Sequence, residues 1–279
     1  RRKMLNLFKS IFLPDTFQLA NGKIVKEKFN WTPYITIIVM ILVVICAQIT
    51  KLDIKVWLRN GKNFVQMIND MFPPNFGFFS TMLKPMIATI MMSLLGTLIA
   101  AVIALPLSFY CSANPEFKLN KYLLTANRTA LGLLRTLPVL VYAKLIALIF
   151  GSGAFSGMLA IAIFTLPICV KMMYEQIETV EMGPYEAISS TGASRIKSLW
   201  CSIFPQVKGY YYSTVLYNFE MNVRSAAILG YVGAGGIGVL INTQLTWRSY
   251  GNTGLMLLVL VIAVIIIESL SRYLRGKLV

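Results

Sequence analysis

The chain has 279 residues, of which 57% are hydrophobic, 26 are Lys or Arg, 11 are Asp or Glu, and none is histidine. A membrane-spanning helix needs about 20 predominantly apolar residues, and four long runs carry no charge at all: 34–50, 86–115, 145–170 and 251–267. These runs exclude a soluble globular domain and predict an all-α integral membrane protein with about six transmembrane helices.

The net charge of +15 could suit a nucleic-acid partner, but the basic residues mostly flank the apolar runs, as the positive-inside rule describes. No basic stripe with interleaved aromatic residues lies outside those flanks. We therefore expect a lipid bilayer, and no nucleic acid, around this chain.

The sequence offers no candidate for catalysis or metal binding. Histidine, the commonest general base and metal ligand, is absent. The four cysteines lack the spacing of metal ligands; they are Cys46, Cys111, Cys169 and Cys201. We expect no metal site, no catalytic residue and no enzyme activity of the chain's own.

Three segments are predicted ahead of the main body. Residues 1–33 form a basic cytoplasmic N-terminal segment suited to anionic lipid, and 34–50 form the first transmembrane helix. This first run begins late for a cleaved signal peptide and no small-residue cleavage site follows it, so we expect it to be retained. Residues 51–84 are predicted to be an extracytoplasmic amphipathic segment.

Residues 85–279 are predicted to form one membrane-embedded core. Its five further spans cover about 85–110, 132–150, 155–173, 207–238 and 254–271, and a long polar segment lies at 174–205. Six spans put both termini on one side of the membrane. Seventeen basic residues fall on that side and five on the other, so we expect both termini and the polar segment in the cytoplasm.

The polar segment contains signals for two short helices. Gly183-Pro184 begins one helix, Gly192 can end it, and a second begins at Ala193. Pro205 is expected to mark the turn into the next span. One apolar face of the second helix is predicted from Ile196, Leu199, Trp200 and Ile203. Two helices joined at a glycine would form a compact body able to transmit a mechanical push.

Residues 174–205, here called the coupling loop, resemble the coupling motif of ABC import permeases: Glu-Ala-Ala, three residues, Gly, nine residues, Ile, any residue, Leu-Pro. The matches at this spacing are Glu186, Ala187, Gly192 and Pro205, and the departures are Ile188, Ser202 and Phe204. The resemblance implies that the loop, including Ala193, couples to an ATPase. An ordinary amphipathic cytoplasmic loop is the alternative.

A closer likeness follows in 216–226, Leu-Tyr-Asn-Phe-Glu-Met-Asn-Val-Arg-Ser-Ala, and in 229–238, Leu-Gly-Tyr-Val-Gly-Ala-Gly-Gly-Ile-Gly. Both are similar to the signature of phosphonate-type permeases. Two further pieces, Met-Phe-Pro-Pro-Asn-Phe at 71–76 and Arg-Thr-Leu-Pro at 135–138, fit the same family. The likeness covers most of the chain from about residue 57 onward.

The resemblance implies a type I importer permease in the bacterial inner membrane, taking up phosphonates or a related small phosphorus oxyanion. Its implied partners are two ABC ATPase subunits, a second copy of itself or a paralogous permease, and an extracytoplasmic solute-binding protein. The sequence lacks the Gly-x-x-x-x-Gly-Lys-Ser/Thr phosphate loop. We therefore expect ATP and Mg on the partner ATPase and no cofactor on this chain.

The glycine cluster, Gly233, Gly235 and Gly236, belongs to the run Gly-Ala-Gly-Gly-Ile-Gly at 233–238, which formally matches the G-x-G-x-x-G dinucleotide-binding fingerprint. That fingerprint needs a preceding strand and an acidic residue about 20 positions later, yet no Asp or Glu occurs between Glu220 and Glu268. We instead expect these glycines to let helices approach closely or to bend the outer end of the fifth span, near the extracytoplasmic gate.

Ionisable residues inside a span are costly and usually face a partner or a water-filled path. Lys144 lies about 13 Å along the helix from Arg135, and Glu220 lies roughly 18 Å into the fifth span, at 1.5 Å per residue. Glu220 can pair with Lys144 or with Arg224. The functional alternative is that Lys144 or Arg224 lines the substrate path, whereas Arg128 and Arg135 are expected to snorkel to lipid headgroups.

Two other functions remain open from the sequence. An ion-coupled secondary transporter of small anions would predict inverted repeats, and none is evident. A membrane scaffold without transport activity would not need ionisable residues in the bilayer. Copurification with an ATPase separates the importer from both.

Overall fold

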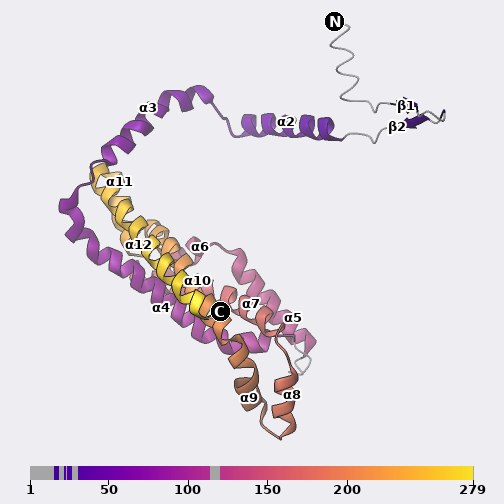
Figure 1. Ribbon diagram of the computed structural model, residues 1–279. Helices are drawn as coiled ribbons and strands as arrows, with labels where there is room; N and C mark the ends of the chain where they lie inside the picture. Colours follow the sequence, from indigo (N-terminus) through magenta and orange to yellow (C-terminus); the bar gives the residue numbers. More distant parts are fainter. Residues whose placement is uncertain (1–15, 19–21, 23, 27–30, 114–119, 279) are drawn as a thin grey trace. The chain divides into compact units, whose positions relative to one another are not determined.

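The computed structural model describes the chain except for residues 1–15, 19–21, 23, 27–30, 114–119 and 279 (Figure 1). It divides into two compact units, Arg1–Val65 and Gln66–Val279. Helices make up most of the described part of each unit, as an all-α membrane fold requires.

The first unit opens with a small hairpin that the sequence did not predict. Strands β1 (Thr16–Gln18) and β2 (Ile24–Lys26) pair antiparallel, with Thr16 opposite Lys26. Strands of three residues are too short for an alternation pattern to reveal them. Helix α2 (Thr32–Ile49) follows, and it is long and apolar enough to be the predicted first span. None of its residues is buried.

Helix α3 (Ile54–Met71) carries its apolar residues mainly on one side, within the segment predicted to be amphipathic. Its position on the outer surface of the membrane stays a prediction.

The second unit contains the other spans. Helices α4 (Phe79–Cys111, preceded by the 3₁₀ turn η1, Phe76–Phe78), α7 (Ala154–Ile177) and α12 (Tyr250–Leu278) are each long and apolar enough to cross a membrane. Two bent pairs also pass as spans: α5 (Lys121–Thr136) with α6 (Val139–Phe150), and the run Arg195–Val232 with α11 (Ile237–Thr246). With each pair counted as one span, the described residues hold the six that the sequence predicts.

The third span, predicted at about 132–150, is formed by two helices and is bent within that range. Helices α5 and α6 meet at 87°. Leu137 is extended, with ψ 131°, because the ring of Pro138 disfavours a helical conformation in the residue before it. Pro138 is itself extended and becomes the N-cap of α6.

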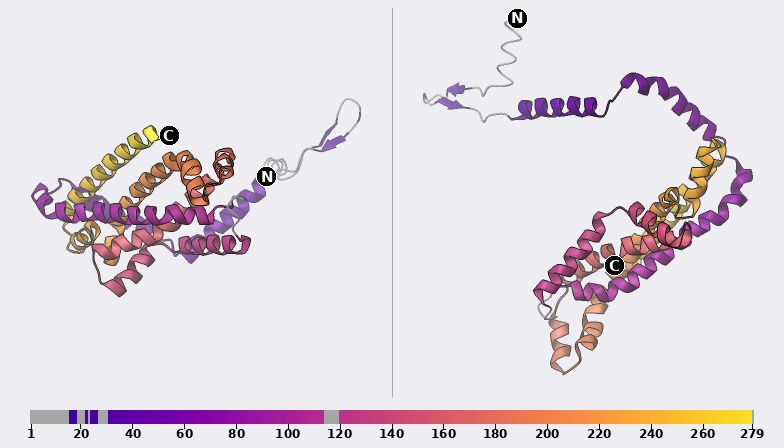
Figure 2. Two further views of the ribbon diagram at one scale, coloured as in Figure 1. Left: turned by 90° about the horizontal axis from the view of Figure 1, so that it is seen from below. Right: turned by 180° about the vertical axis from the view of Figure 1, so that it is seen from behind.

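Small residues bring α4 and α7 close together along their shared face (Figure 2). A Cβ atom at Gly96 of α4 would lie 2.7 Å from the backbone oxygen of Met158 in α7. Ala100, Ala104 and Ala160 are also fully buried. Because lipid tails are as apolar as the helices, packing of small residues rather than a hydrophobic force between helices drives such association.

Helix α10 (Phe204–Leu229) joins this pair through a buried polar contact. The side-chain amide of Asn222 donates to the hydroxyl of Thr97 in α4 at 2.8 Å and to that of Thr165 in α7 at 2.9 Å. All three side chains are buried. The hydroxyl of Ser93 donates to the backbone oxygen of Asn222 at 3.4 Å. One asparagine therefore links three spans.

The glycine cluster ends α10 as predicted. A 3₁₀ turn, η4 (Gly230–Val232), leads to Gly233, Gly235 and Gly236, whose φ angles are +87°, +76° and +75°. Only glycine adopts such angles without strain. The backbone N–H of Ile237 then donates to the hydroxyl of Thr89 at 2.7 Å, which anchors the start of α11 to α4.

We predict that Asn222→Ala destabilises the three-helix contact by about 1–3 kcal/mol, since it removes two buried hydrogen bonds. The measurement is the midpoint of thermal unfolding of the chain in detergent. Asn242→Ala is the matched control, because Asn242 is exposed on α11. Equal midpoints for the two variants would contradict the assigned role of Asn222.

Candidate functional site

The coupling loop begins with a helix that is anchored on one side and exposed on the other. Helix α8 (Gly183–Ser190) has Pro184 in its first turn and Glu186 near its N-terminus, where a carboxylate is favoured. Glu186 and Ala187 are exposed. Tyr185 is buried and packs with Met173, Ile177, Ile203 and Val207. The side of α8 that carries Glu186 and Ala187 is therefore exposed and available to contact another subunit.

Gly192 produces the break between the two short helices. Its φ is +80°, and a Cβ atom there would meet nothing within 4 Å. Its backbone angle, and not crowding, therefore makes glycine suitable at this position. The chain turns through Ala193 and Ser194 and enters α9 (Arg195–Ser198).

No turn follows at Pro205, and the prediction of one is wrong. Helix α9 continues through a π-helical segment, η3 (Leu199–Ile203), directly into α10. The N–H of Phe204 donates to the backbone oxygen of Leu199, five residues back. Proline lacks an N–H and its ring crowds the carbonyl four residues before it, so the wider π turn accommodates Pro205 in the first turn of α10.

The π turn also divides the apolar face predicted for the second helix. One extra residue rotates the side chains that follow by about 100° relative to an α-helix. Ile203 consequently enters the buried cluster, whereas Ile196 and Trp200 are exposed.

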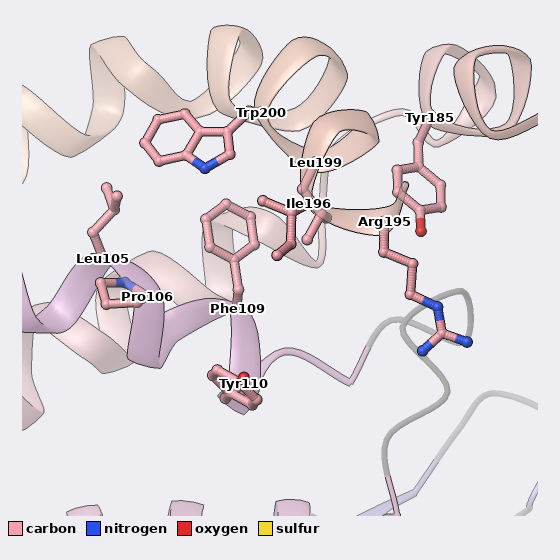
Figure 3. A pocket seen from close by; sticks show the side chains of 9 residues that line it. All are labelled: Leu105, Pro106, Phe109, Tyr110, Tyr185, Arg195, Ile196, Leu199 and Trp200. Atoms are coloured by element: carbon pink, nitrogen blue, oxygen red, sulfur yellow. The ribbon is translucent and has the colours of Figure 1, made fainter. Parts of the chain in front are cut away.

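The exposed part of that face lines an apolar groove of about 520 Å³. Figure 3 shows the end of α4 on one side of it and the second coupling helix on the other. The lining residues are Leu105, Pro106, Phe109, Tyr110, Tyr185, Arg195, Ile196, Leu199 and Trp200.

Of the ionisable residues predicted in the spans, Glu220 and Arg224 come together and Lys144 does not join them. Glu220 is buried and forms ion pairs with Arg224, one helical turn on, and with Arg275 of α12 at 3.1 Å. Within the part of the chain that the structure describes, Lys144 forms no ion pair and is exposed on α6.

Helix α12 extends the cluster around Glu220. Arg224 lies 3.8 Å from Glu268, which pairs with Arg272 at 2.6 Å. Helix α12 runs past residue 271, the predicted end of the sixth span, and its last turns carry Arg272 and Arg275 to the cluster. Glu268 and Arg272 are four residues apart, a spacing from which the sequence could have predicted a charged face on this helix.

The two candidate regions lie at opposite ends of one helix. The coupling loop precedes α10, and the glycine cluster follows it 26 residues later, about 39 Å at 1.5 Å per residue. Gly235 packs at the start of α7, where a Cβ atom would lie 2.6 Å from the backbone nitrogen of Ala154. Gly236 packs against Thr89 and Met92 of α4. Their role at a gate stays a prediction.

Known proteins resemble this chain, two of the three described here over most of its length. The putative phosphite transport system permease protein HtxC of Stutzerimonas stutzeri is 30% identical, with 94% of this chain and 92% of that protein covered. The phosphite transport system permease protein PtxC of the same organism is 28% identical, covering 86% and 87%. The putative cryptic phosphonate transport system permease protein PhnE2 of Escherichia coli K12 is 37% identical, over 42% of this chain and 97% of that protein.

Among solved structures, the fold is similar to a chain of the MetNI methionine ABC transporter in an inward-facing conformation, with a TM-score of 0.64 at 18% identity. That match covers 74% of this chain and 99% of the other. Residues 104–278 match the family described as the binding-protein-dependent transport system inner membrane component. The match includes the coupling loop, the charged cluster and the glycine cluster, and the chain accordingly belongs to this family of multi-pass inner-membrane permease subunits, as its sequence predicted.

Proposed function

We propose that this chain is the permease subunit of an ATP-driven importer for phosphonates or a related small phosphorus oxyanion. The single observation that carries the coupling role is the continuous helical run Arg195–Val232, which joins the coupling loop to the glycine cluster. The substrate class is supported by the relatives named for phosphite and phosphonate transport, two of which align over most of the chain.

The proposed complex contains two ATPase subunits, which bind ATP and Mg²⁺, and a second copy of this chain or a paralogous permease. A solute-binding protein would deliver substrate from outside, and both termini would lie in the cytoplasm. The exposed outer face of α8, with Glu186 and Ala187, would contact the ATPase. Closure of the ATPase pair would push the coupling loop, and α10 would carry that displacement toward the extracytoplasmic side of the membrane.

Glu186→Arg and Gly192→Pro are each predicted to abolish stimulation of ATPase activity by substrate. The first reverses a charge on the exposed face of α8, and the second forbids the positive φ at the break. The measurement is the ATPase activity of the complex with its binding protein, titrated with a panel of phosphonates and phosphite. Asp70→Arg is the matched charge reversal, on the exposed surface of α3.

Stimulation by one panel member, retained in Asp70→Arg and lost in the two loop variants, is the expected result. An assembled complex that ignores the whole panel would refute the substrate class. Failure of the chain to copurify with any ATPase would refute the importer and favour the ion-coupled secondary transporter.

The charged cluster around Glu220 is a candidate for the substrate path. Three arginines and two glutamates leave it with one net positive charge, and Arg224 is nearly half exposed although it lies within a span. Arg224 already pairs with Glu220, and the exposed part of its guanidinium group can still meet an anion or water. We propose that Arg224 attracts the anionic substrate and that Lys144 does so from α6.

Arg224→Met and Lys144→Met are each predicted to lower the rate of uptake about tenfold or more, the effect of losing one charged hydrogen bond. Glu220 retains Arg275 as a partner in Arg224→Met, so the fold is expected to survive. Lys208→Met, an exposed lysine on α10, is the control for charge alone. Uptake in proteoliposomes is measured with assembly checked by copurification, and normal transport in both variants would disprove this path.

A further inference from the structure

A second cationic site lies away from the Glu220 cluster, between α5 and α7, which run side by side (Figure 1). It is a pocket of about 280 Å³. Its lining residues are Arg128, Leu131, Gly132, Arg135, Pro167, Lys171 and Tyr174. Three of the seven are cationic and none is acidic, which is unusual for a pocket walled by two membrane helices.

Arg128 lies at the end of the pocket that the predicted topology places toward the cytoplasm, and several contacts fix its side chain. Its Nε donates to the backbone oxygen of Cys111 at 2.7 Å, and its guanidinium pairs with Glu178. The same group lies 4.3 Å from the centre of the Tyr174 ring. Glu178 also accepts the N–H of Ala113 at 2.6 Å, so Arg128 joins the ends of α4, α5 and α7.

The other two cations are less satisfied. Lys171 pairs with Glu175 at 3.3 Å, and about two fifths of its side chain stays exposed. Arg135 forms no hydrogen bond or ion pair with any residue that the structure describes. It is exposed in the last turn of α5, where the helix end favours a cation, and no described residue accepts a hydrogen bond from its guanidinium group. Two carboxylates thus offset three cations.

The size and donor geometry of the pocket select one class of ligand. The volume of about 280 Å³ lies just below the range of about 300–1,000 Å³ for drug-sized ligands, so the pocket accommodates a phosphorus oxyanion or the phosphodiester of a lipid headgroup. Arginine offers a planar fork that binds phosphate oxygens in pairs, and lysine adds a compact charge. Snorkelling alone, expected for Arg128 and Arg135 from the sequence, does not account for their convergence with Lys171 on one cavity.

We propose that Arg128, Arg135 and Lys171 form a binding site for a phosphorus oxyanion. The P–O⁻ groups would meet the free donors of Arg135, with Lys171 and Arg128 supplying further charge. This chemistry is shared by the transported substrate and by the phosphodiester of an anionic lipid. The assignment to substrate rests on the proposed function, and the assignment to lipid does not.

The experiment uses the full chain assembled with its ATPase partners in two kinds of nanodisc. One contains phosphatidylcholine alone, and the other adds phosphatidylglycerol. Binding of phosphite and methylphosphonate is followed by calorimetry in the first, and retention of phosphatidylglycerol by native mass spectrometry in the second. If the complex binds phosphite or methylphosphonate in the first nanodisc, or retains phosphatidylglycerol in the second, Arg135→Gln is expected to weaken that binding at least about tenfold.

Two further variants separate the site from a general charge effect. Gly132→Leu keeps all three cations and fills the pocket, since a Cβ atom at Gly132 meets nothing within 4 Å. It is expected to weaken binding as Arg135→Gln does. Lys121→Gln removes one charge from the same helix at a residue that lines a different surface depression, and it is expected to bind like the wild type.

Loss of phosphite or methylphosphonate binding in Arg135→Gln and Gly132→Leu would establish the substrate as the ligand. Loss of phosphatidylglycerol retention, without binding of the small anions, would establish the lipid. Unchanged binding of both kinds in the two variants would overturn the site, even if the wild-type complex transports phosphorus compounds. Absence of such transport would overturn the proposed function, while lipid retention that depends on Arg135 would still support the site.

Discussion

One buried amide, that of Asn222, makes three helices of this permease into a single body. In hydrocarbon no water replaces a lost hydrogen bond, so donor and acceptor must meet inside the protein. Thr97 and Thr165 meet this need from α4 and α7. Small residues such as Gly96 allow the backbones to approach closely, which brings the short side chains of these helices within reach of one another. The polar contact and the tight packing therefore depend on each other.

The same body explains how the coupling loop could act at a distance. Helix α10 belongs to it through Asn222 and is continuous with α9 through the π turn at Leu199–Ile203. A push that reaches α9 would consequently move a long helix instead of being absorbed at a hinge near Pro205. Beyond Gly192, the next sharp break is at the glycine cluster, where α11 departs at 49°. The coupling loop and the glycine cluster thus lie at the two ends of one continuous helical run.

Two clusters of charged side chains in the second unit differ in how their charges are balanced. Glu220 is enclosed by arginines from α10 and α12, which offsets much of the cost of burying its carboxylate. The pocket between α5 and α7 instead leaves Arg135 without a protein partner among the described residues. Arg135 is exposed in the last turn of α5, where the proposed oxyanion would supply the partner that the described residues do not. The two clusters therefore differ in how far protein carboxylates pair with their cations.

The sequence by itself determined the membrane class, the family and the number of spans, because a bilayer demands long apolar helices whatever their neighbours. It also located the break at Gly192. The bend before Pro138 was signalled by the proline and was overlooked. Only the tertiary structure decided that Glu220 pairs with Arg275, 55 residues away, and that Arg135 and Lys171 share a pocket. These contacts depend on how the helices are rotated and packed against one another, and the residue pattern of a single helix does not reveal that arrangement.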